Sequence, residues 1–276
     1  MIYVTSDIHG NLDRYKKLKN ELITNDDQLY IIGDVLDRGP CGFDILDDIM
    51  NSPNVELLYG NHELAHAMIY YHTKQYEATH LPEEKKQIMR WKSYILEPIA
   101  GGLTTQKELK NMTKEKKELY MEYLLSLKYT KVIDMNGRKF VLSHGSIASN
   151  KIAGVTDRID MTLLHVPLIV GDTIKDVVSF KIAKNINSVG EALEFKNTLD
   201  DLASRGYCTN AICVVGHTPT CYLYCKEKAM TVLKIGNNIN IDCGCRGFNP
   251  NREFPGGHTG RLACLRLDDG KTFYFD

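Results

Sequence analysis

Three short apolar segments alternate with two amphipathic helical segments in the first sixty residues, and this alternation constrains the fold more than any other feature. Strands are predicted over 2–5, 28–32 and 55–59. Helices are predicted over 42–50 and after Asn11, whose side chain can cap a helix. A strand–helix–strand order of this kind predicts a parallel sheet with helices packed on its face, which is an α/β fold.

Helical spacing replaces this alternation over about 64–128, where Pro82 can begin one helix and a Gly-Gly pair at 101–102 interrupts the pattern. Strands then return, and the Asn-Gly pair at 136–137 predicts a hairpin turn. No repeat or linker is evident, so we expect a single domain over 1–276 with a helical insert over about 64–128. The later strands are expected over 132–134, 139–142, 212–215, 230–234, 239–241, 262–267 and 272–275, with a capped helix from 188 to about 206.

The charge balance excludes a generally basic, nucleic-acid-binding exterior. Lys and Arg total 34 against 35 Asp and Glu, which gives a formal net charge of −1. No segment reaches the roughly 18 to 20 apolar residues that a membrane-spanning helix needs. Strand-like residues follow Met1 at once, without the basic and apolar regions of a signal peptide. We therefore expect a soluble, cytoplasmic protein with no nucleic-acid or membrane partner.

Polar side chains follow five of the predicted strands. A histidine after one strand is usually a structural hydrogen-bonding residue, and a glycine there commonly serves a tight turn. In open α/β sheets, however, ligands bind at the carboxyl ends of the strands, so five such ends favour one convergent site. The residues concerned are Asp7 and His9, Asp34 with Asp37 and Arg38, Asn61 and His62, His144, and His217.

The types of residue in this set indicate metal-dependent phosphate chemistry. Aspartate, asparagine and imidazole without cysteine suit Mn, Fe or Zn. A carboxylate can bridge two metal ions, and ions about 3.5–4 Å apart form a clamp for in-line phosphoryl displacement. A guanidinium such as that of Arg38 offers paired donors that match the oxygens of a phosphate.

The chain resembles the phosphoprotein phosphatase family of dinuclear metallophosphoesterases in the residues, order and spacing of five motifs. These are Asp7-Ile8-His9-Gly10, Gly33-Asp34-Val35-Leu36-Asp37-Arg38-Gly39, Gly60-Asn61-His62-Glu63, His144-Gly145 and Gly216-His217. The resemblance implies the calcineurin-like metallophosphoesterase fold, in which two central β-sheets pack as a sandwich flanked by helices. Compact bacterial and phage-type serine/threonine phosphatases are the members that the chain is most similar to.

The resemblance also implies two divalent metal ions, with Mn favoured over Fe or Zn. Asp7 and His9 would bind the first ion, and Asp34 would bridge it to the second. The remaining implied ligands of the second ion are Asn61, His144 and His217.

The same resemblance assigns catalytic and substrate-binding roles. Arg38 and Asn61 would hold the substrate phosphate, and a metal-bridging hydroxide would attack the phosphorus. His62 would protonate the leaving oxygen, with Asp37 orienting its imidazole. Relatives often carry a second phosphate-binding arginine, for which Arg205 and Arg158 are the candidates. No role is expected for His66, His72, His80, His165 and His258, nor for Arg246 and Arg252.

These residues predict a hydrolase of phosphate monoesters, with phosphoserine and phosphothreonine in proteins as the first substrate class. Hydrolysis of a dinucleoside polyphosphate such as diadenosine tetraphosphate is the alternative, because such hydrolases share the scaffold. The presence of Asp37 favours the monoesterase, since those hydrolases often lack this aspartate. A catalytically inactive scaffold is the third hypothesis, and the intact set of ligands, with His62 and Arg38, argues against it.

Overall fold

The structure is a computed structural model that describes residues 1–98, 100–145, 212–223, 227–235, 238–246, 254 and 257–276. The amino-terminal half contains β1 (Ile2–Thr5), α1 (Leu12–Leu22), β2 (Gln28–Ile32), α2 (Gly42–Met50), β3 (Val55–Leu58), α3 (Asn61–Thr79), α4 (Pro82–Leu96), α5 (Leu103–Lys110) and α6 (Lys114–Ser126). The remainder contains β4 (Thr130–Met135), β5 (Arg138–Ser143), β6 (Ile212–Val215), a short 3-10 turn (Thr220–Tyr222), β7 (Leu233–Ile235), β8 (Asn238–Asn240), β9 (Leu262–Arg266) and β10 (Thr272–Phe275).

The first sheet has five strands in the order β10-β9-β1-β2-β3. β1 pairs in parallel with β2, and β2 with β3, which confirms the parallel arrangement predicted for the first sixty residues. β9 is antiparallel to both β1 and β10, so the sheet is mixed. Its central strands are apolar at successive positions because both faces are covered.

The second sheet has the order β4-β5-β6-β8-β7. β4 and β5 form the hairpin predicted at 136–137, where Asn136 (φ 51°) and Gly137 (φ 71°) both adopt the left-handed conformation. β6 lies between β5 and β8 and is parallel to both. The strand expected over 230–234 begins later and ends one residue later, at Leu233–Ile235, and the helix expected from 188 lies outside the described residues.

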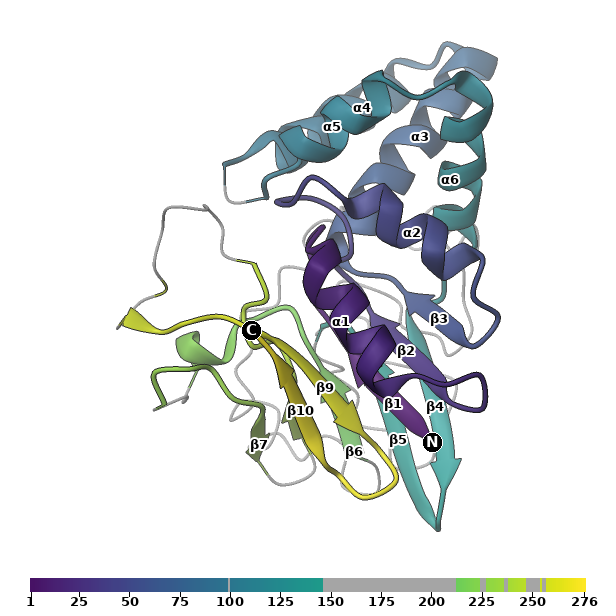
Figure 1. Cartoon of the computed structure of the whole chain (residues 1–276). Helices are drawn as coiled ribbons and strands as arrows, with labels where there is room; N and C mark the ends of the chain where they lie inside the picture. The colour runs from purple at the N-terminus through teal and green to yellow at the C-terminus, as the bar shows by residue number, and fades with distance from the viewer. Residues whose placement is uncertain (99, 146–211, 224–226, 236–237, 247–253, 255–256) are drawn as a thin grey trace.

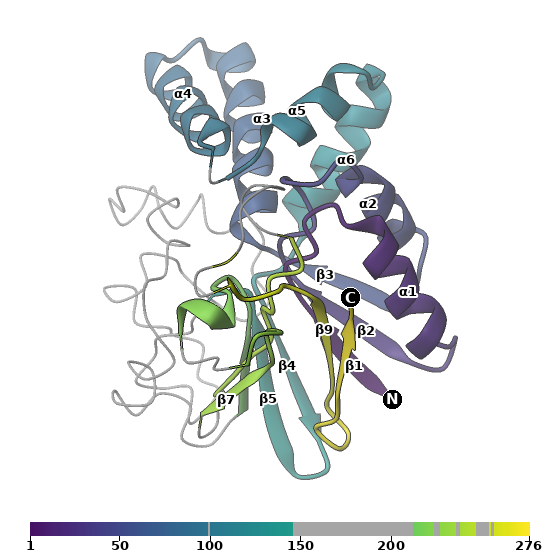
Figure 2. The same ribbon diagram turned by 60° about the vertical axis from the view of Figure 1, so that its left-hand side comes forward.

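The two sheets pack face to face, and helices cover the outer face of the first sheet (Figures 1 and 2). Val4 and Ile32 of the first sheet belong to the same buried cluster as Leu142 and Val214 of the second. Tyr3, one position from Val4, points the other way into the cluster that includes α1 and α2. The α/β sandwich expected from the resemblance is therefore present.

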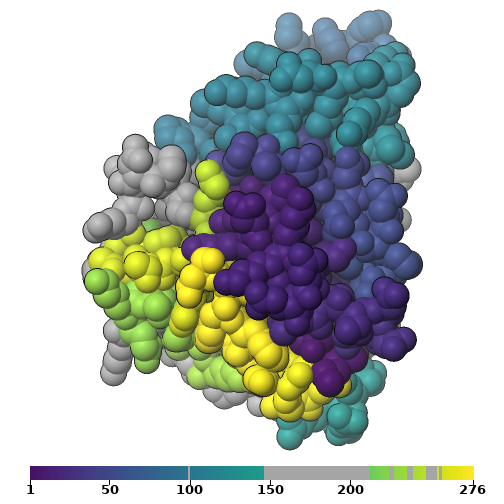
Figure 3. Space-filling view, in the orientation of Figure 1, coloured from purple at the N-terminus to yellow at the C-terminus, as the bar shows by residue number. Residues whose placement is uncertain are grey.

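Helices α3 to α6 extend from one end of this sandwich, as Figure 3 shows in blue and teal above the purple and yellow residues of the two chain ends. α5 was not among the predicted helices. It has only eight residues, and of these Thr105 alone is buried, so it carries no apolar stripe that a sequence pattern could detect. Within the part of the chain that the structure describes, no helix is both long and apolar enough to cross a membrane.

Candidate metal centre and active site

Two groups of potential metal ligands meet at the ends of β1, β2, β3, β5 and β6, and both contain Asp34. In the first group, His144 Nε2 lies 3.3 Å from Asp34 Oδ2. Asn61 Oδ1 lies 3.0 Å from His144 Nε2 and 2.9 Å from His217 Nδ1, and the two ring nitrogens are 3.1 Å apart. Three potential ligand atoms, from the start of α3 and from the loops after β5 and β6, therefore form a tight triangle beside the Asp34 carboxylate.

The second group approaches the same oxygen of Asp34. His9 Nε2 and His62 Nε2 are each 3.6 Å from Asp34 Oδ2. The His and Asp ligand atoms within each of the two groups all lie within 4.8 Å of one another. Asp34 belongs to both groups, so the bridging role that the resemblance implies for it stays a prediction that this placement allows.

Asp7 is the one expected metal ligand that lies outside both groups. Its Oδ2 atom accepts hydrogen bonds from the Ser6 hydroxyl and from the backbone N–H of His217, the latter at 2.9 Å. Burial raises the pKa of this carboxyl, and nearby His144 partly offsets the effect. Asp7 therefore anchors the His217 loop against the end of β1 and leaves Oδ1 as the atom that could reach a cation.

The imidazoles of His9 and His144 are oriented so that Nε2 faces the cluster. Their Nδ1 atoms contact the backbone carbonyls of Leu36 at 3.0 Å and Ile32 at 2.8 Å. Since a carbonyl only accepts, Nδ1 carries the proton and Nε2 is the atom left for a ligand. His9 Nε2 is buried and has no hydrogen-bond partner among the described residues. The unpartnered His9 Nε2 and the nearby ligand atoms of the two groups fit divalent cations.

The electrostatics of the cluster agree with this fit. Burial, together with the charge of Arg38, holds the pKa of His9 well below its usual range. Burial would also lower the pKa of His144, but the carboxylates of Asp34 and Asp7 raise it to about 10. The carboxylates of Asp34 and Asp7 therefore stabilise positive charge beside His144, and a bound cation can supply that charge in place of the His144 proton.

Backbone strain is concentrated in the same loops. Among the described residues, Asp7, His9 and Asp34 have φ of 55°, 49° and 58°, values that side chains other than glycine rarely adopt. Asp37, Arg38 and His217 are also left-handed, with φ between 61° and 71°. Such strain persists where surrounding contacts over-determine the conformation, and it is typical of functional sites.

Glu63 makes many of the contacts that hold these strained loops in place, a role that the sequence did not reveal. Its Oε2 accepts the backbone N–H of Asp34 at 2.7 Å and of Gly60 at 3.1 Å. Its Oε1 accepts the N–H groups of Val35 and Leu36, each at 2.9 Å. One fully buried carboxylate therefore fixes the whole turn after β2. The only sequence signal was its place in the first turn of α3, where glutamate commonly serves as a cap.

His62 is oriented by Asp37. His62 Nδ1 lies 2.7 Å from Asp37 Oδ2, so Nε2 points toward Asp34. Burial lowers the pKa of His62, but Asp34 and Asp37 outweigh it and raise the pKa. A raised pKa favours the protonated imidazole that a proton donor needs. His66, for which no role was expected, contacts the other oxygen of Asp37.

The helical region reaches the site at three points. Thr105 Oγ1 accepts the backbone N–H of Asp37 at 3.0 Å, and the carbonyl of Gly101 accepts that of Arg38 at 3.1 Å. The hydroxyl of Tyr94 accepts the Asn61 side-chain amide at 2.8 Å, which turns Asn61 Oδ1 toward the histidines. Helices α4 and α5 therefore help to position loops that lie far away in the sequence.

Arg38 and the candidates for a second arginine differ in what the structure shows. Burial lowers the pKa of His217 to about 3, and the charges of His144, His62 and Arg38 act in the same direction, so the Arg38 guanidinium lies near the cluster. Its Nη1 also approaches the carbonyl of Arg246 at 3.5 Å. Arg158 and Arg205 lie outside the described residues, as do His165 and Arg252.

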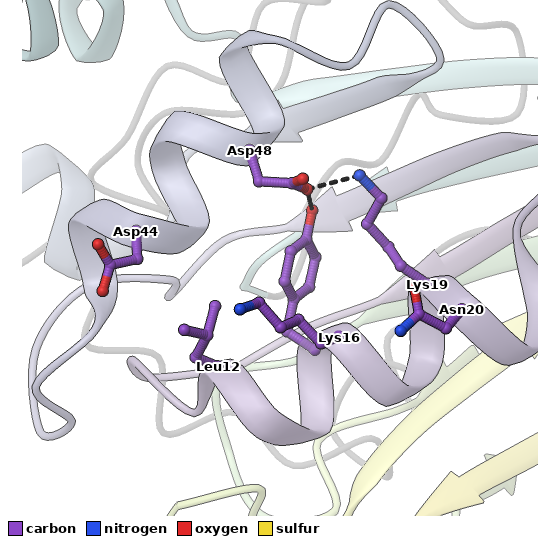
Figure 4. A pocket seen from close by; sticks show the side chains of 7 residues that line it. Leu12, Lys16, Lys19, Asn20, Asp44 and Asp48 are labelled. Atoms are coloured by element: carbon purple, nitrogen blue, oxygen red, sulfur yellow. Dashed lines mark hydrogen bonds and ion pairs between the residues drawn. The ribbon is translucent and has the colours of Figure 1, made fainter.

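A hollow between α1 and α2 lies apart from this cluster and contains none of the expected site residues (Figure 4). Its lining includes Tyr15 and Lys19 from α1 and Asp48 from α2, which contact one another. No unpartnered buried polar atom of the described chain lies among its lining residues.

Comparison with known proteins agrees with this geometry. The family model of calcineurin-like phosphoesterases matches residues 1–220. The chain belongs to this family. Metallophosphoesterases are hydrolases, and the two groups of His and Asp residues described above could hold the divalent metal ions that the family uses.

The individual proteins that the chain is similar to have names that describe different phosphoesterases. The symmetrical bis(5'-nucleosyl)-tetraphosphatase of Serratia proteamaculans is 34% identical over 71 residues, which is 25% of this chain and 25% of that protein. The chain thus matches only a quarter of this curated relative's length. A candidate diadenosine tetraphosphatase has a similar structure, with a TM-score of 0.50, 14% identity, and coverage of 99% of this chain and 91% of the other. A cold-active protein-tyrosine phosphatase of a psychrophilic Shewanella has a TM-score of 0.51, 17% identity and coverage of 100% and 80%. At these identities the two structures establish the fold alone.

Proposed function

We propose that the protein is a cytoplasmic, dinuclear metal-dependent phosphatase that hydrolyses phosphate monoesters, with phosphoserine and phosphothreonine in proteins as its substrates. The observation that carries this proposal is the pair formed by Asp37 and His62, in which His62 also approaches Asp34. A phosphomonoester with a basic leaving oxygen needs a proton donor there, and His62 Nε2 is directed at Asp34 rather than at solvent.

The proposed metal centre uses all six expected ligands. His9, Asp7 and Asp34 would hold one ion, and Asp34 would share the second with Asn61, His144 and His217. Oxygen and imidazole donors without thiolate favour Mn, with Fe or Zn as alternatives. When bound, such ions lower the pKa of a coordinated water and polarise the phosphoryl oxygens.

The protein's own residues divide the remaining work. Arg38 would bind the phosphate oxygens with paired N–H donors and neutralise charge that develops on them. Asp37 accepts the Nδ1 proton of His62 and thereby keeps Nε2 in place to donate a proton to the leaving oxygen. Asn61, whose amide is held by Tyr94, would complete the binding surface for the phosphate.

Hydrolysis of a dinucleoside polyphosphate is the second candidate, favoured by the 34% identical segment of the Serratia tetraphosphatase. A phosphoanhydride has a weakly basic leaving group and depends less on a proton donor than a serine phosphate does. The complete Asp37–His62 pair therefore supports the monoesterase over this alternative.

A side-by-side assay tests the choice. One preparation, supplied with MnCl₂, would be given a phosphoserine peptide, a phosphotyrosine peptide and diadenosine tetraphosphate. We expect the highest kcat/KM with the phosphoserine peptide. Preference for diadenosine tetraphosphate would establish the alternative, and no hydrolysis together with no bound metal would refute both.

A further inference from the structure

Two histidines, rather than one, hold the carboxylate of Asp37. His62 Nδ1 lies 2.7 Å from Asp37 Oδ2, and His66 Nε2 lies 2.8 Å from Asp37 Oδ1. The two histidines are four residues apart on α3, so they lie on the same face of the helix, one turn apart. All three side chains are at most 2% exposed.

Both imidazoles must be the hydrogen-bond donors in this arrangement. A carboxylate only accepts hydrogen bonds, and each oxygen of Asp37 lies within hydrogen-bond distance of a ring nitrogen, 2.7 Å from His62 Nδ1 and 2.8 Å from His66 Nε2. Because each oxygen has its own donor, the carboxylate cannot turn without losing one of the two bonds. Asp37 itself has a strained, left-handed backbone (φ 65°), so its side-chain contacts are needed to keep it in place.

We propose that His66 is a positioning residue for phosphoester cleavage: it holds Oδ1 of Asp37 so that Oδ2 keeps the His62 imidazole aimed at the leaving oxygen. This inference rests on the proposed function. His66 belongs to neither of the ligand groups found among the described residues, and it would act through Asp37.

The dependence of the rate on the leaving group distinguishes this role from simple packing. Proton donation matters greatly for phenyl phosphate, whose leaving oxygen is basic, and little for p-nitrophenyl phosphate, whose leaving oxygen is not. A misaligned His62 therefore slows the first substrate much more than the second. A general loss of structure would slow both substrates by the same factor.

The test compares three variants at this position. His66→Phe keeps a ring but removes the donor, and we expect its kcat for phenyl phosphate to fall about 10- to 100-fold, as for other outer-shell partners. Its kcat for p-nitrophenyl phosphate should fall by less than about threefold, and the KM values for the two substrates should be nearly unchanged. His66→Gln has an amide N–H at a similar reach and should restore most of the lost rate. His66→Asn is too short to reach Asp37 and provides a polar variant with the same expected loss if the Phe variant does not fold.

His72 provides a matched control on the same helix. It is also a largely buried histidine that contacts a carboxylate, with Nδ1 2.6 Å from Glu84 Oε2, and it is remote from Asp37 in the sequence. His72→Phe is expected to lower the melting temperature without changing the ratio of the two rates. The same ratio change in His72→Phe would show that the effect of His66 is structural and would overturn the proposal.

A measurement without substrate separates this inference from the proposed function. The N–H proton that His62 shares with Asp37 should give a strongly downfield NMR resonance in the wild-type protein. We expect this resonance to shift or broaden in His66→Phe and to return in His66→Gln, whether or not the protein hydrolyses the chosen esters. An unchanged resonance, or equal losses of rate on both esters in an active enzyme, would refute the role of His66. Inactivity of the wild type on every ester would refute only the proposed function.

Discussion

Asp37 in the candidate site and Asp48 in the hollow between α1 and α2 each accept hydrogen bonds from two side chains, yet their surroundings differ. Asp48 takes the Tyr15 hydroxyl and the Lys19 ammonium, each at 2.6 Å, and its side chain is 42% exposed (Figure 4). Asp37 is fully buried and accepts hydrogen bonds from two imidazoles. The first arrangement joins two regular helices at the surface, and the second lies in a strained loop.

The comparison teaches how a binding site differs from a structural contact. Near Asp48, a permanent cation is already present, so the charge is balanced by the protein alone. Around Asp34, carboxylates face histidines whose protons a metal ion can replace, and His9 Nε2 has no hydrogen-bond partner in the described part of the chain. The hollow balances its charge with its own side chains, whereas the site gathers atoms that could hold a metal ion.

The largest expected effect comes from removing the carboxylate shared by the two ligand groups. Asp34→Asn should lower kcat by at least about 10³-fold, since the transition-state stabilisation that bound metal ions provide is worth several kcal/mol. Metal analysis should also find fewer bound ions than in the wild type. Asp48→Asn is the matched control in the hollow and should leave both kcat and metal content unchanged. Full metal content and turnover in Asp34→Asn would remove the distinction between the two regions.

The second prediction separates a proton donor from a ligand. His62 is near enough to Asp34 and His9 to be counted with them as a possible metal-binding group. If its role is proton donation, His62→Asn should lower kcat for a phosphoserine peptide by about 10²–10⁴-fold and leave the metal content intact. Parallel loss of metal would instead make His62 a ligand, and the comparison between substrates with good and poor leaving groups would then show no difference.

Much of this molecule could be predicted from the sequence, for physical reasons that particular elements illustrate. The boundaries of α2 and β2 were predicted correctly because apolar periodicity and burial coincide there. The convergence of loop residues followed from the parallel order of β1 to β3, which brings their carboxyl ends to one edge.

What escaped prediction depends on contacts between distant segments. His66 looked like an ordinary helical histidine because its partner, Asp37, is 29 residues away along the chain. Glu63 gave no sign that it holds four backbone N–H groups, three of them in the turn after β2. Thr105 lies in a short helix with no periodic pattern, and its contact with Asp37 exists only in the folded protein.

The third prediction concerns the dependence of the site on the helical region. Thr105 is fully buried and accepts the Asp37 backbone N–H, whereas Asp48 is held by α1 and needs no helix beyond α2. Thr105→Val keeps the shape but leaves that N–H unpaired, so the free energy of unfolding should fall by about 1–3 kcal/mol. Thr105→Ser keeps the hydroxyl and should lose less. Urea denaturation checks the order, and equal stability of the two variants would contradict it.

The smallest expected effect concerns Glu108 of α5, a half-buried carboxyl that has no imidazole partner. Burial, together with the charges of Asp44 and Asp37, raises its pKa from 4.5 to about 7, although the N–H of Phe43 opposes the shift. A carboxyl whose pKa is higher in the folded state stabilises the fold below pH 4.5, and this contribution disappears as the pH rises through 7. The melting temperature of the wild type relative to Glu108→Gln should therefore be higher at pH 5 than at pH 8. Asp37 is also buried, but two imidazoles shift its pKa in the opposite direction. If the melting temperatures of the wild type and Glu108→Gln differ by the same amount at pH 5 and pH 8, the pKa of Glu108 is not raised in the folded protein and the contrast with Asp37 fails.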